Sequence, residues 1–282
     1  MAQTFSTRIG DTNSQSFRAP SAAISVRNLT VSYAAQVAHK EAEGSVAVDN
    51  VSFDVQPGEF VAIVGPSGCG KSTILKALAN LITPSRGEVN VSHEERGRPR
   101  IGFVFQSDAL LPWKTALKNV ELAVRLAGEP NHVASVRATQ LMTELGLGDS
   151  CHKYPAQLSG GMRKRVSLAR ALAHSPSVFL MDEPFGALDA LTRIQVGNFC
   201  LDIFDRARQS VVFVTHDIDE AVAMSDRVLV MSDRPGRLIA EFKVDLPRPR
   251  DYHETRFVDG FTDLQQVVWK ALTTGGRNVH SV

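Results

Sequence analysis

The sequence of 282 residues predicts an α/β fold, and two patterns support this. Residues 60–64 are apolar at every position, as expected of a strand that is buried on both faces of a sheet. Similar apolar runs recur along the chain and are separated by stretches long enough for helices, which is typical of α/β proteins. Residues 24–31 and 46–55 instead alternate apolar and polar residues, which indicates half-buried strands in an antiparallel patch. The remaining expected strands are residues 101–105, 178–181, 211–215, 227–231 and 238–244.

The strand pattern disappears between Phe105 and Val178. Apolar residues recur there at helical spacing, which predicts a helical subdomain over about residues 107–175. The residues that carry this spacing are Val133, Val136, Leu141, Met142 and Leu145.

By composition the chain divides into three parts. Residues 1–22 are rich in Ser, Thr, Gln and Asn and lack periodicity, so we expect a disordered N-terminal arm. Residues 23–245 carry the strand and helix patterns and form the expected main domain. Residues 246–282 are expected to form a C-terminal tail with one helix near residues 263–271.

Charge and composition exclude several classes of protein. The net charge is +1, which argues against a nucleic-acid partner. The three cysteines are too few and too scattered for a disulfide framework or a zinc site, so a reducing compartment such as the cytosol fits best. No stretch approaches the roughly 20 apolar residues of a membrane-spanning helix. The N-terminus has no apolar core of the kind that a secretory signal carries, so we expect any action at a membrane to go through a partner.

The loop after residues 60–64 has the pattern of a phosphate-binding loop. Glycines there let backbone N–H groups approach a triphosphate, and the following helix points its positive end at the same phosphates. Lys71 would reach the β- and γ-phosphates of ATP, and the Ser72 hydroxyl would ligate Mg²⁺. A glycine-rich turn is the alternative, but a buried strand before the loop and a helix after it favour phosphate binding. The pattern G-x-x-x-x-G-K-[ST] is filled by Gly65, Pro66, Ser67, Gly68, Cys69, Gly70, Lys71 and Ser72, and Thr73 follows directly.

Two further strands end in polar residues suited to phosphate chemistry. Asp182 ends an apolar run and would hold Mg²⁺ through water. Glu183, the next residue, is then placed to polarise the water that attacks the γ-phosphate. Adjacent acids are common in ordinary loops, so this signal depends on the phosphate loop. His216 closes another strand, where it could contact the γ-phosphate or be a partly exposed polar residue.

A short motif before a predicted helix resembles a family signature. Leu158, Ser159, Gly160, Gly161 and Met162 closely resemble LSGGQ, the signature of ATP-binding-cassette (ABC) ATPases, with Met162 where glutamine is usual. A serine and two glycines at a helix N-terminus form a second anion cradle. In the ABC family this cradle serves the γ-phosphate bound by the opposite subunit of a dimer. The resemblance covers about residues 24–244.

The resemblance implies a fold and roles for further residues. It implies a P-loop NTPase (RecA-like) core with an antiparallel β subdomain and a helical signature subdomain. Tyr33 resembles the aromatic residue that stacks on adenine, with a surface tyrosine as the competing interpretation. Gln106 resembles the glutamine that senses Mg²⁺ and links to the permease. Asp189 lies in the loop by which the two subunits sense each other, and His216 matches the switch histidine. The implied catalytic residues are Glu183, His216, Gln106 and Lys71.

Three segments resemble the nitrate/sulfonate/taurine importer branch of the family: residues 110–114, 182–189 and 232–237. This implies an ATPase homodimer that energises uptake of a small anionic solute through membrane permease subunits, with a solute-binding protein as an indirect partner. It also implies a peripheral location on the cytoplasmic face of the inner membrane. Trp113 would face the groove for a permease helix, or else pack inside the helical insertion.

Two other classes remain as alternatives. One is an ABC ATPase that acts on DNA or ribosomes without a permease. The chain has neither the long coiled coils nor the second cassette usual in such proteins. The other is a cassette that binds ATP only for regulation, and the filled catalytic positions argue against it.

Overall fold

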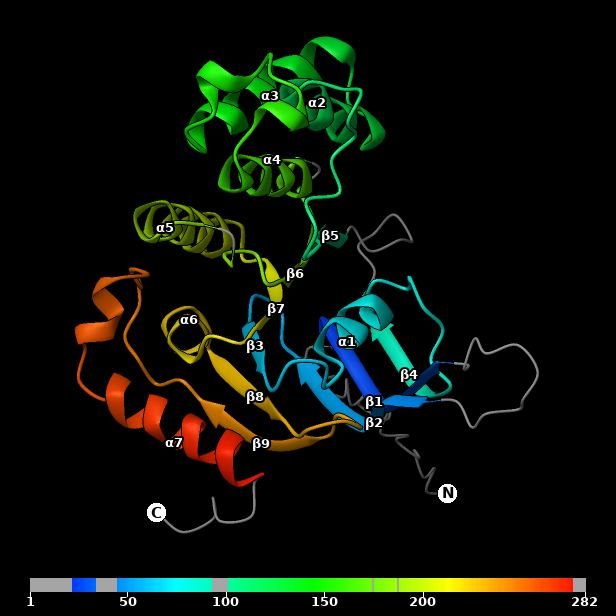
Figure 1. Cartoon of the computed structure of the whole chain (residues 1–282), viewed down its shortest axis with the longest axis vertical. Helices are drawn as coiled ribbons and strands as arrows, with labels where there is room; N and C mark the ends of the chain where they lie inside the picture. Colours follow the sequence, from blue (N-terminus) through cyan, green and yellow to red (C-terminus); the bar gives the residue numbers. More distant parts are fainter. Residues whose placement is uncertain (1–21, 34–44, 93–100, 174, 187, 276–282) are drawn as a thin grey trace, which may run out of the picture.

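The computed structural model describes residues 22–33, 45–92, 101–173, 175–186 and 188–275 (Figure 1). The N-terminal arm expected at residues 1–22 lies almost wholly outside the described residues. The same holds for the polar stretch that follows Tyr33 and for Ala187, which lies between the motif acids and Asp189.

A six-stranded sheet forms the centre of the molecule, in the order β5-β6-β7-β3-β8-β9. Its first five strands are parallel and β9 is antiparallel at the edge. Every residue of β3, β6 and β7 is buried, as their continuous apolar runs predicted. The strand bounds are Phe60–Val64 for β3, Ile101–Val104 for β5, Val178–Asp182 for β6, Ser210–Thr215 for β7, Arg227–Met231 for β8 and Leu238–Lys243 for β9.

The two faces of this sheet are covered differently. Side chains alternate between the faces, so Phe60, Ala62 and Val64 of β3 enter a core shared with helices α4 to α7. Val61 and Ile63 enter a second core shared with α1 and a smaller sheet. The helices are α1 (Lys71–Leu78), α2 (Ala116–Leu126), α3 (Asn131–Glu144), α4 (Gly160–Leu172), α5 (Ala190–Ala207), α6 (Ile218–Met224) and α7 (Phe261–Thr274).

The smaller sheet is antiparallel, as the alternating pattern predicted, in the order β2-β1-β4. Its strands are β1 (Ile24–Tyr33), β2 (Ser45–Val55) and β4 (Arg86–Val91). The sequence analysis missed β4. No residue of β4 is buried, so it lacks the apolar pattern that reveals a half-buried strand, and its pairing with β1 defines it.

Helices α2, α3 and α4 lie together at one end of the molecule, away from the smaller sheet (Figure 1). We propose that they form a subdomain of their own at about residues 107–175. The helical spacing predicted there corresponds to α3, but Val136, one of the residues that carried it, is 70% exposed. The buried face of α3 is formed by Ala134, Ala138, Leu141 and Met142.

The C-terminal segment packs onto the molecule. The 3₁₀ helix η3 (Glu254–Phe257) is followed by α7, which is longer than the predicted helix and contacts α6, β8 and β9. Its inward face is formed by Phe261, Val268 and Ala271, which join the main core. Among the described helices, none combines the length and the hydrophobicity needed to cross a membrane.

Candidate nucleotide-binding site

The phosphate loop connects the buried strand β3 to α1. Gly68 and Gly70 have positive φ values of 80° and 103°, which side chains rarely adopt. A Cβ at Gly70 would also lie 2.7 Å from the carbonyl oxygen of Ala47. The local fold therefore requires glycine there, and the backbone N–H groups at the start of α1 are left accessible to an anion.

Lys71 lies inside the loop. Its ammonium group donates hydrogen bonds to the carbonyl oxygens of Gly65 at 2.7 Å and Pro66 at 2.9 Å. Both bonds compensate for the burial of this charge, since the Lys71 side chain is almost fully covered. A cation is thereby held at the inner wall of the loop, where a phosphate would bind.

Ser72 and Asp182 bring two oxygen donors together from α1 and β6. The Ser72 hydroxyl donates to Asp182 Oδ1 at 2.9 Å. Asp182 is only 4% exposed, and burial raises the pKa of its carboxyl group. A hard divalent cation prefers such oxygen ligands and would favour the ionised form of Asp182. In the described parts of the chain, no group of three or more His, Cys, Asp or Glu side chains could hold a metal ion by itself.

Glu183 is the meeting point of three strand ends. Its Oε2 accepts a hydrogen bond from Gln106 Nε2 at 3.3 Å, and its Oε1 lies 3.3 Å from His216 Nδ1. Gln106, Glu183 and His216 follow β5, β6 and β7, so their contact reflects the parallel order of these strands. Glu183 has a φ of 47°, and its N–H donates to the carbonyl oxygen of Val214 at 2.9 Å. A left-handed backbone at a non-glycine residue is strained, which is common at functional sites.

A pocket of about 470 Å³ is lined by Lys71, Ser72, Gln106 and Glu183, but not by Asp182 or His216. Tyr33 forms one wall, and its hydroxyl lies 3.2 Å from Thr73 Oγ1. The structure thus places Tyr33 beside the phosphate loop, and its stacking on adenine stays a prediction. The residues that line the pocket are Tyr33, Ala47, Ser67, Gly68, Gly70, Lys71, Ser72, Thr73, Gln106, Glu183 and Arg234.

Two of these residues, Ala47 and Arg234, were missed from the sequence. Arg234 lies in the loop after β8 and donates to Ser45 Oγ at 2.6 Å. This loop is held against β2, since the Gly236 N–H donates to the carbonyl oxygen of Ala47 at 3.0 Å. Their place depends on tertiary contacts between distant segments. The signal that could have found Arg234 is its positive charge within residues 232–237, a segment used in the sequence analysis only to indicate the family branch.

The signature segment and Asp189 lie apart from this pocket. Ser159 caps α4 by accepting the Met162 N–H at 3.3 Å, and Gly160 opens the helix. Asp189 caps α5 in the same way, accepting the Thr192 N–H at 3.0 Å, which lowers the pKa of its carboxyl group. None of the predicted residues Ser159, Gly160, Gly161 and Asp189 is among those that line the pocket around the phosphate loop.

Comparisons with known proteins show which family this chain resembles. The family model described as ABC transporter matches residues 48–186. A putative ATP-binding protein of Brucella abortus is 44% identical over 81% of this chain and 88% of its own. The taurine import ATP-binding protein TauB of Rhizobium johnstonii is 46% identical over 72% of this chain and 78% of its own. The aliphatic sulfonates import ATP-binding protein SsuB 1 of Streptomyces avermitilis is 43% identical over 87% of this chain and 86% of its own.

The fold matches a solved structure as well. The dimeric ATP-binding cassette MJ0796, in a post-hydrolysis state bound to ADP and Pi, aligns with a TM-score of 0.69 and 33% identity. That match covers 78% of this chain and 98% of the other. The fold and the phosphate loop thus define an α/β ATPase of the P-loop class. The chain belongs to the ABC transporter family, which confirms the family and the fold predicted from the sequence.

Proposed function

We propose that this chain is the ATP-hydrolysing subunit of an ABC importer and that it energises uptake of a small anionic solute. The observation that carries the proposal is the contact of Glu183 with Gln106 and His216 beside the phosphate loop. The names of two relatives, a taurine and an aliphatic sulfonate import protein, support import and a solute of the taurine or sulfonate type. A solute of the nitrate type is supported by sequence resemblance.

In this proposal, each part of the pocket has one task in ATP hydrolysis. The loop N–H groups and Lys71 bind the β- and γ-phosphates, and Tyr33 stacks on the adenine. Glu183 accepts the proton of the water that attacks the γ-phosphate, and His216 and Gln106 hold its carboxylate in place. Mg²⁺, when bound by Ser72 and Asp182 with Gln106 nearby, supplies charge neutralisation at the phosphates.

The chain is proposed to act as a homodimer. Ser159, Gly160 and Gly161 form a capped, anion-accepting helix start that has no place in the pocket of its own chain. The solved cassettes that it resembles are dimers. The segment would therefore contact the γ-phosphate held by the partner subunit, and Asp189 would lie at the same interface.

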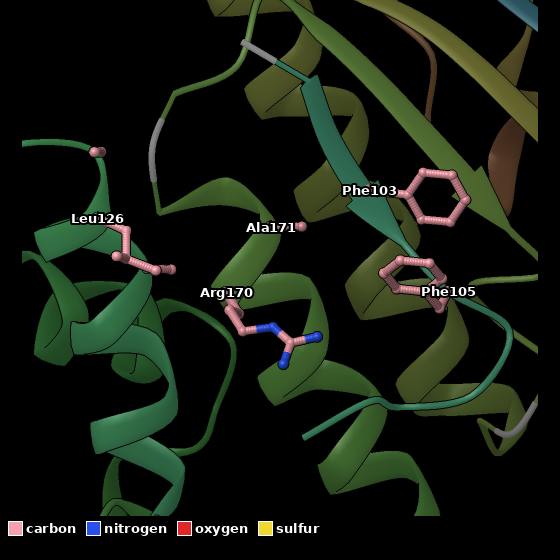
Figure 2. Close-up of a pocket in the computed structure, with 7 residues that line it drawn as sticks. Phe103, Phe105, Leu126, Arg170 and Ala171 are labelled. Carbon is pink, nitrogen blue, oxygen red and sulfur yellow. The ribbon is translucent and has the colours of Figure 1, made fainter. Parts of the chain in front are cut away.

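A second pocket provides the proposed docking surface for the permease. It has a volume of about 550 Å³ and is mostly apolar, and Leu126 at its rim is 80% exposed. Figure 2 shows Phe103 and Phe105 on one side of this pocket and Leu126 on the other. Phe105 directly precedes Gln106, so an occupant of this pocket would contact the chain next to Gln106, which itself contacts Glu183. The pocket is lined by Phe103, Phe105, Ala123, Leu126, Ala127, Arg170 and Ala171.

Trp113 is a further exposed apolar side chain that a protein partner would cover in this proposal. Its side chain is 70% exposed, so the alternative in which it packs inside the helical region is wrong. Exposed large apolar side chains of this kind suit a protein partner. The partners proposed are two membrane permease subunits and, indirectly, a solute-binding protein, but no nucleic acid. The chain would then be a peripheral protein on the cytoplasmic face of the inner membrane.

A pull-down tests the proposal. The full chain with Glu183→Gln, loaded with ATP, is used to capture partners from detergent-solubilised membranes of the source cell. A multi-spanning permease together with a solute-binding protein supports the proposal, and the binding protein can then be screened for ligands. Capture of only ribosomal or DNA-associated proteins contradicts it. The matched control adds Leu126→Asp, which changes an exposed side chain and should lose the permease while ATP binding persists.

A further inference from the structure

A buried hydrogen-bond network joins the C-terminal segment to the loop that carries His216. The Tyr252 hydroxyl, on a side chain only 1% exposed, donates to Glu220 Oε1 at 3.1 Å. The other oxygen of Glu220 accepts the hydroxyl of Thr215 at 2.8 Å. Glu220 is itself 4% exposed, so both bonds are shielded from water.

The Thr215 hydroxyl fixes the backbone on both sides of His216. Besides donating to Glu220, it accepts the N–H of Asp217 at 3.0 Å. The Thr215 hydroxyl has one proton, which it donates in the hydrogen bond to Glu220. Its oxygen lone pairs are therefore free to accept the N–H of Asp217. Asp217 in turn caps α6 by accepting the N–H groups of Asp219 and Glu220. The carboxylate of Glu220 therefore orients the bond that spans His216.

The His216 side chain is 61% exposed, and within the described parts of the chain its polar contact is with Glu183. The direction of its ring is accordingly set by the backbone between β7 and α6. A change at Thr215 or Glu220 would be transmitted to the distance between His216 and Glu183.

The ring of Tyr252 is locked in place by α5 and by the loop after Glu183. A Cβ at Gly197 would fall 2.4 Å from the Tyr252 ring, so the helix comes as close as glycine allows. Phe185 meets the ring edge-on at 5.8 Å between centroids. The N–H of Tyr252 donates to Asn198 Oδ1 at 2.6 Å. The hydroxyl is thus aimed at Glu220 by rigid neighbours.

The cation Arg193 lies farther from Glu220 than the two hydroxyls do. It is 3.7 Å from Glu220 Oε1 and 3.8 Å from Asp217 Oδ2, both beyond hydrogen-bond distance. Burial is the main cause that raises the pKa of Glu220, and the hydrogen bond from Thr215, the charge of Arg193 and the hydrogen bond from Tyr252 oppose it. Removing the Tyr252 hydroxyl would leave a buried carboxylate oxygen without its close donor.

We infer that Tyr252 and Glu220 are positioning residues for ATP hydrolysis: through Thr215 they hold the His216 loop against Glu183. The inference rests on the proposed role of His216. Neither residue lines the nucleotide pocket, so both act through the loop. Tyr252 lies in the C-terminal segment and Glu220 on α6, both beyond the span matched by the family model.

The test uses the purified full chain with Tyr252→Phe, Glu220→Gln and the double variant. Both changes preserve side-chain volume, so the fold is kept and is checked by thermal melting. Misplacement of a group at the site should lower kcat for ATP about five- to tenfold, while the Kd for ATP stays within about twofold. Tyr154→Phe, at a more exposed tyrosine in the helical region, is the control and should leave kcat unchanged.

The double variant separates positioning from packing. Because both changes break the same chain of hydrogen bonds, the double variant should be no slower than the slower single variant. Losses that multiply, an unchanged kcat in Tyr252→Phe, or a Kd that weakens in parallel with kcat would each overturn the inference. A wild-type chain that hydrolyses no ATP would overturn the proposed function as well, whereas a hydrolysing wild type with unaffected variants overturns this inference alone.

Discussion

The starts of α1 and α4 are built from the same materials but have different surroundings. Glycines let backbone N–H groups face an anion at both places, in the phosphate loop at α1 and at Ser159–Gly160 at α4. Around α1 the chain gathers Lys71, Ser72, Gln106 and Glu183 along one pocket, and Asp182 lies behind it, bonded to Ser72. The start of α4 lies with α2 and α3 (Figure 1), and its residues do not line that pocket.

This difference shows how much of a reaction centre each region holds. The α1 region has a cation, oxygen donors for a metal ion and a carboxylate placed by two neighbours. At the α4 start, Ser159 bonds to its own helix, and the glycines do not line the pocket of their chain. In the proposed function, the first region binds the nucleotide of its own chain, and the second contacts a nucleotide held by a partner subunit.

The largest effect is expected for Glu183→Gln in the α1 region. Glutamine keeps the size of the side chain but cannot accept a proton, so ATP hydrolysis should fall about 10²–10⁴-fold. ATP binding should persist, because the phosphate loop is untouched. Phosphate release and the equilibrium binding of labelled ATP measure the two quantities. Near-normal turnover would mean that another group is the base and that the α1 region is less complete than its geometry indicates.

A negative charge at the start of α4 should slow ATP hydrolysis strongly without disturbing the fold. In Gly160→Asp the new Cβ would meet only Arg163 Nη2, at 3.7 Å, and a carboxylate in the first turn suits the helix dipole. The same carboxylate would repel a γ-phosphate, so we expect a loss of about 10²-fold in kcat, similar to the loss of a stabilising donor. Single-turnover hydrolysis and melting curves give the two readouts.

Lys71→Ala is the matched change in the α1 region. It removes a charged donor from the phosphate loop, so ATP affinity itself should weaken at least about tenfold. Gly160→Asp should leave the ATP affinity of dilute chains unchanged, because its partner phosphate lies on another subunit. If Gly160→Asp weakened this affinity as Lys71→Ala does, the two regions would serve one nucleotide in one chain, and the comparison would fail.

The sequence predicted the features whose residues lie close together in the chain, and it missed those that depend on pairing or packing. The phosphate loop and β3 were predicted from local pattern, and the start of α4 from its resemblance to the ABC signature, because each lies within a short stretch of the chain. The strand β4 is exposed and is defined by pairing with β1, so it left no pattern. Helical spacing predicted a helix around Val136, but it did not show that Ala134 and Ala138, and not Val136, are buried.

The parts of the site that were missed depend on distant contacts. Arg234 reaches the pocket because its loop pairs with β2, nearly two hundred residues earlier in the chain. Tyr252 and Glu220 are 32 residues apart, and nothing in the local sequence of either points to the other. The roles of Gln106 and His216 beside Glu183 were implied by the resemblance to the ABC family, and in the structure the three residues meet because parallel strands end at the same edge of the sheet.

The smallest expected effect compares Asp182, the buried partner of the pocket residue Ser72, with an acid in the other region. Asp182 is buried with a raised pKa, whereas Asp189 is an exposed helix cap with a lowered pKa. A folded carboxyl with a raised pKa holds its proton more tightly than the unfolded chain does, so stability falls as pH rises from about 3.9 through the raised value. Asp182→Asn escapes this penalty and still accepts the Ser72 hydroxyl. We therefore expect unfolding near pH 7 to cost on the order of 1 kcal/mol more than in wild type.

The pH dependence distinguishes this penalty from ordinary packing. As the pH falls well below about 3.9, Asp182 becomes protonated in both the folded and the unfolded chain, so the gain from Asp182→Asn should largely vanish. Asp189→Asn is the control, since asparagine caps a helix about as well as aspartate and no buried charge is removed. Denaturant unfolding at the two pH values provides the comparison. A gain of equal size at both pH values, or an equal gain from Asp189→Asn, would show that the nucleotide pocket carries no electrostatic cost, and that the two regions differ in geometry alone.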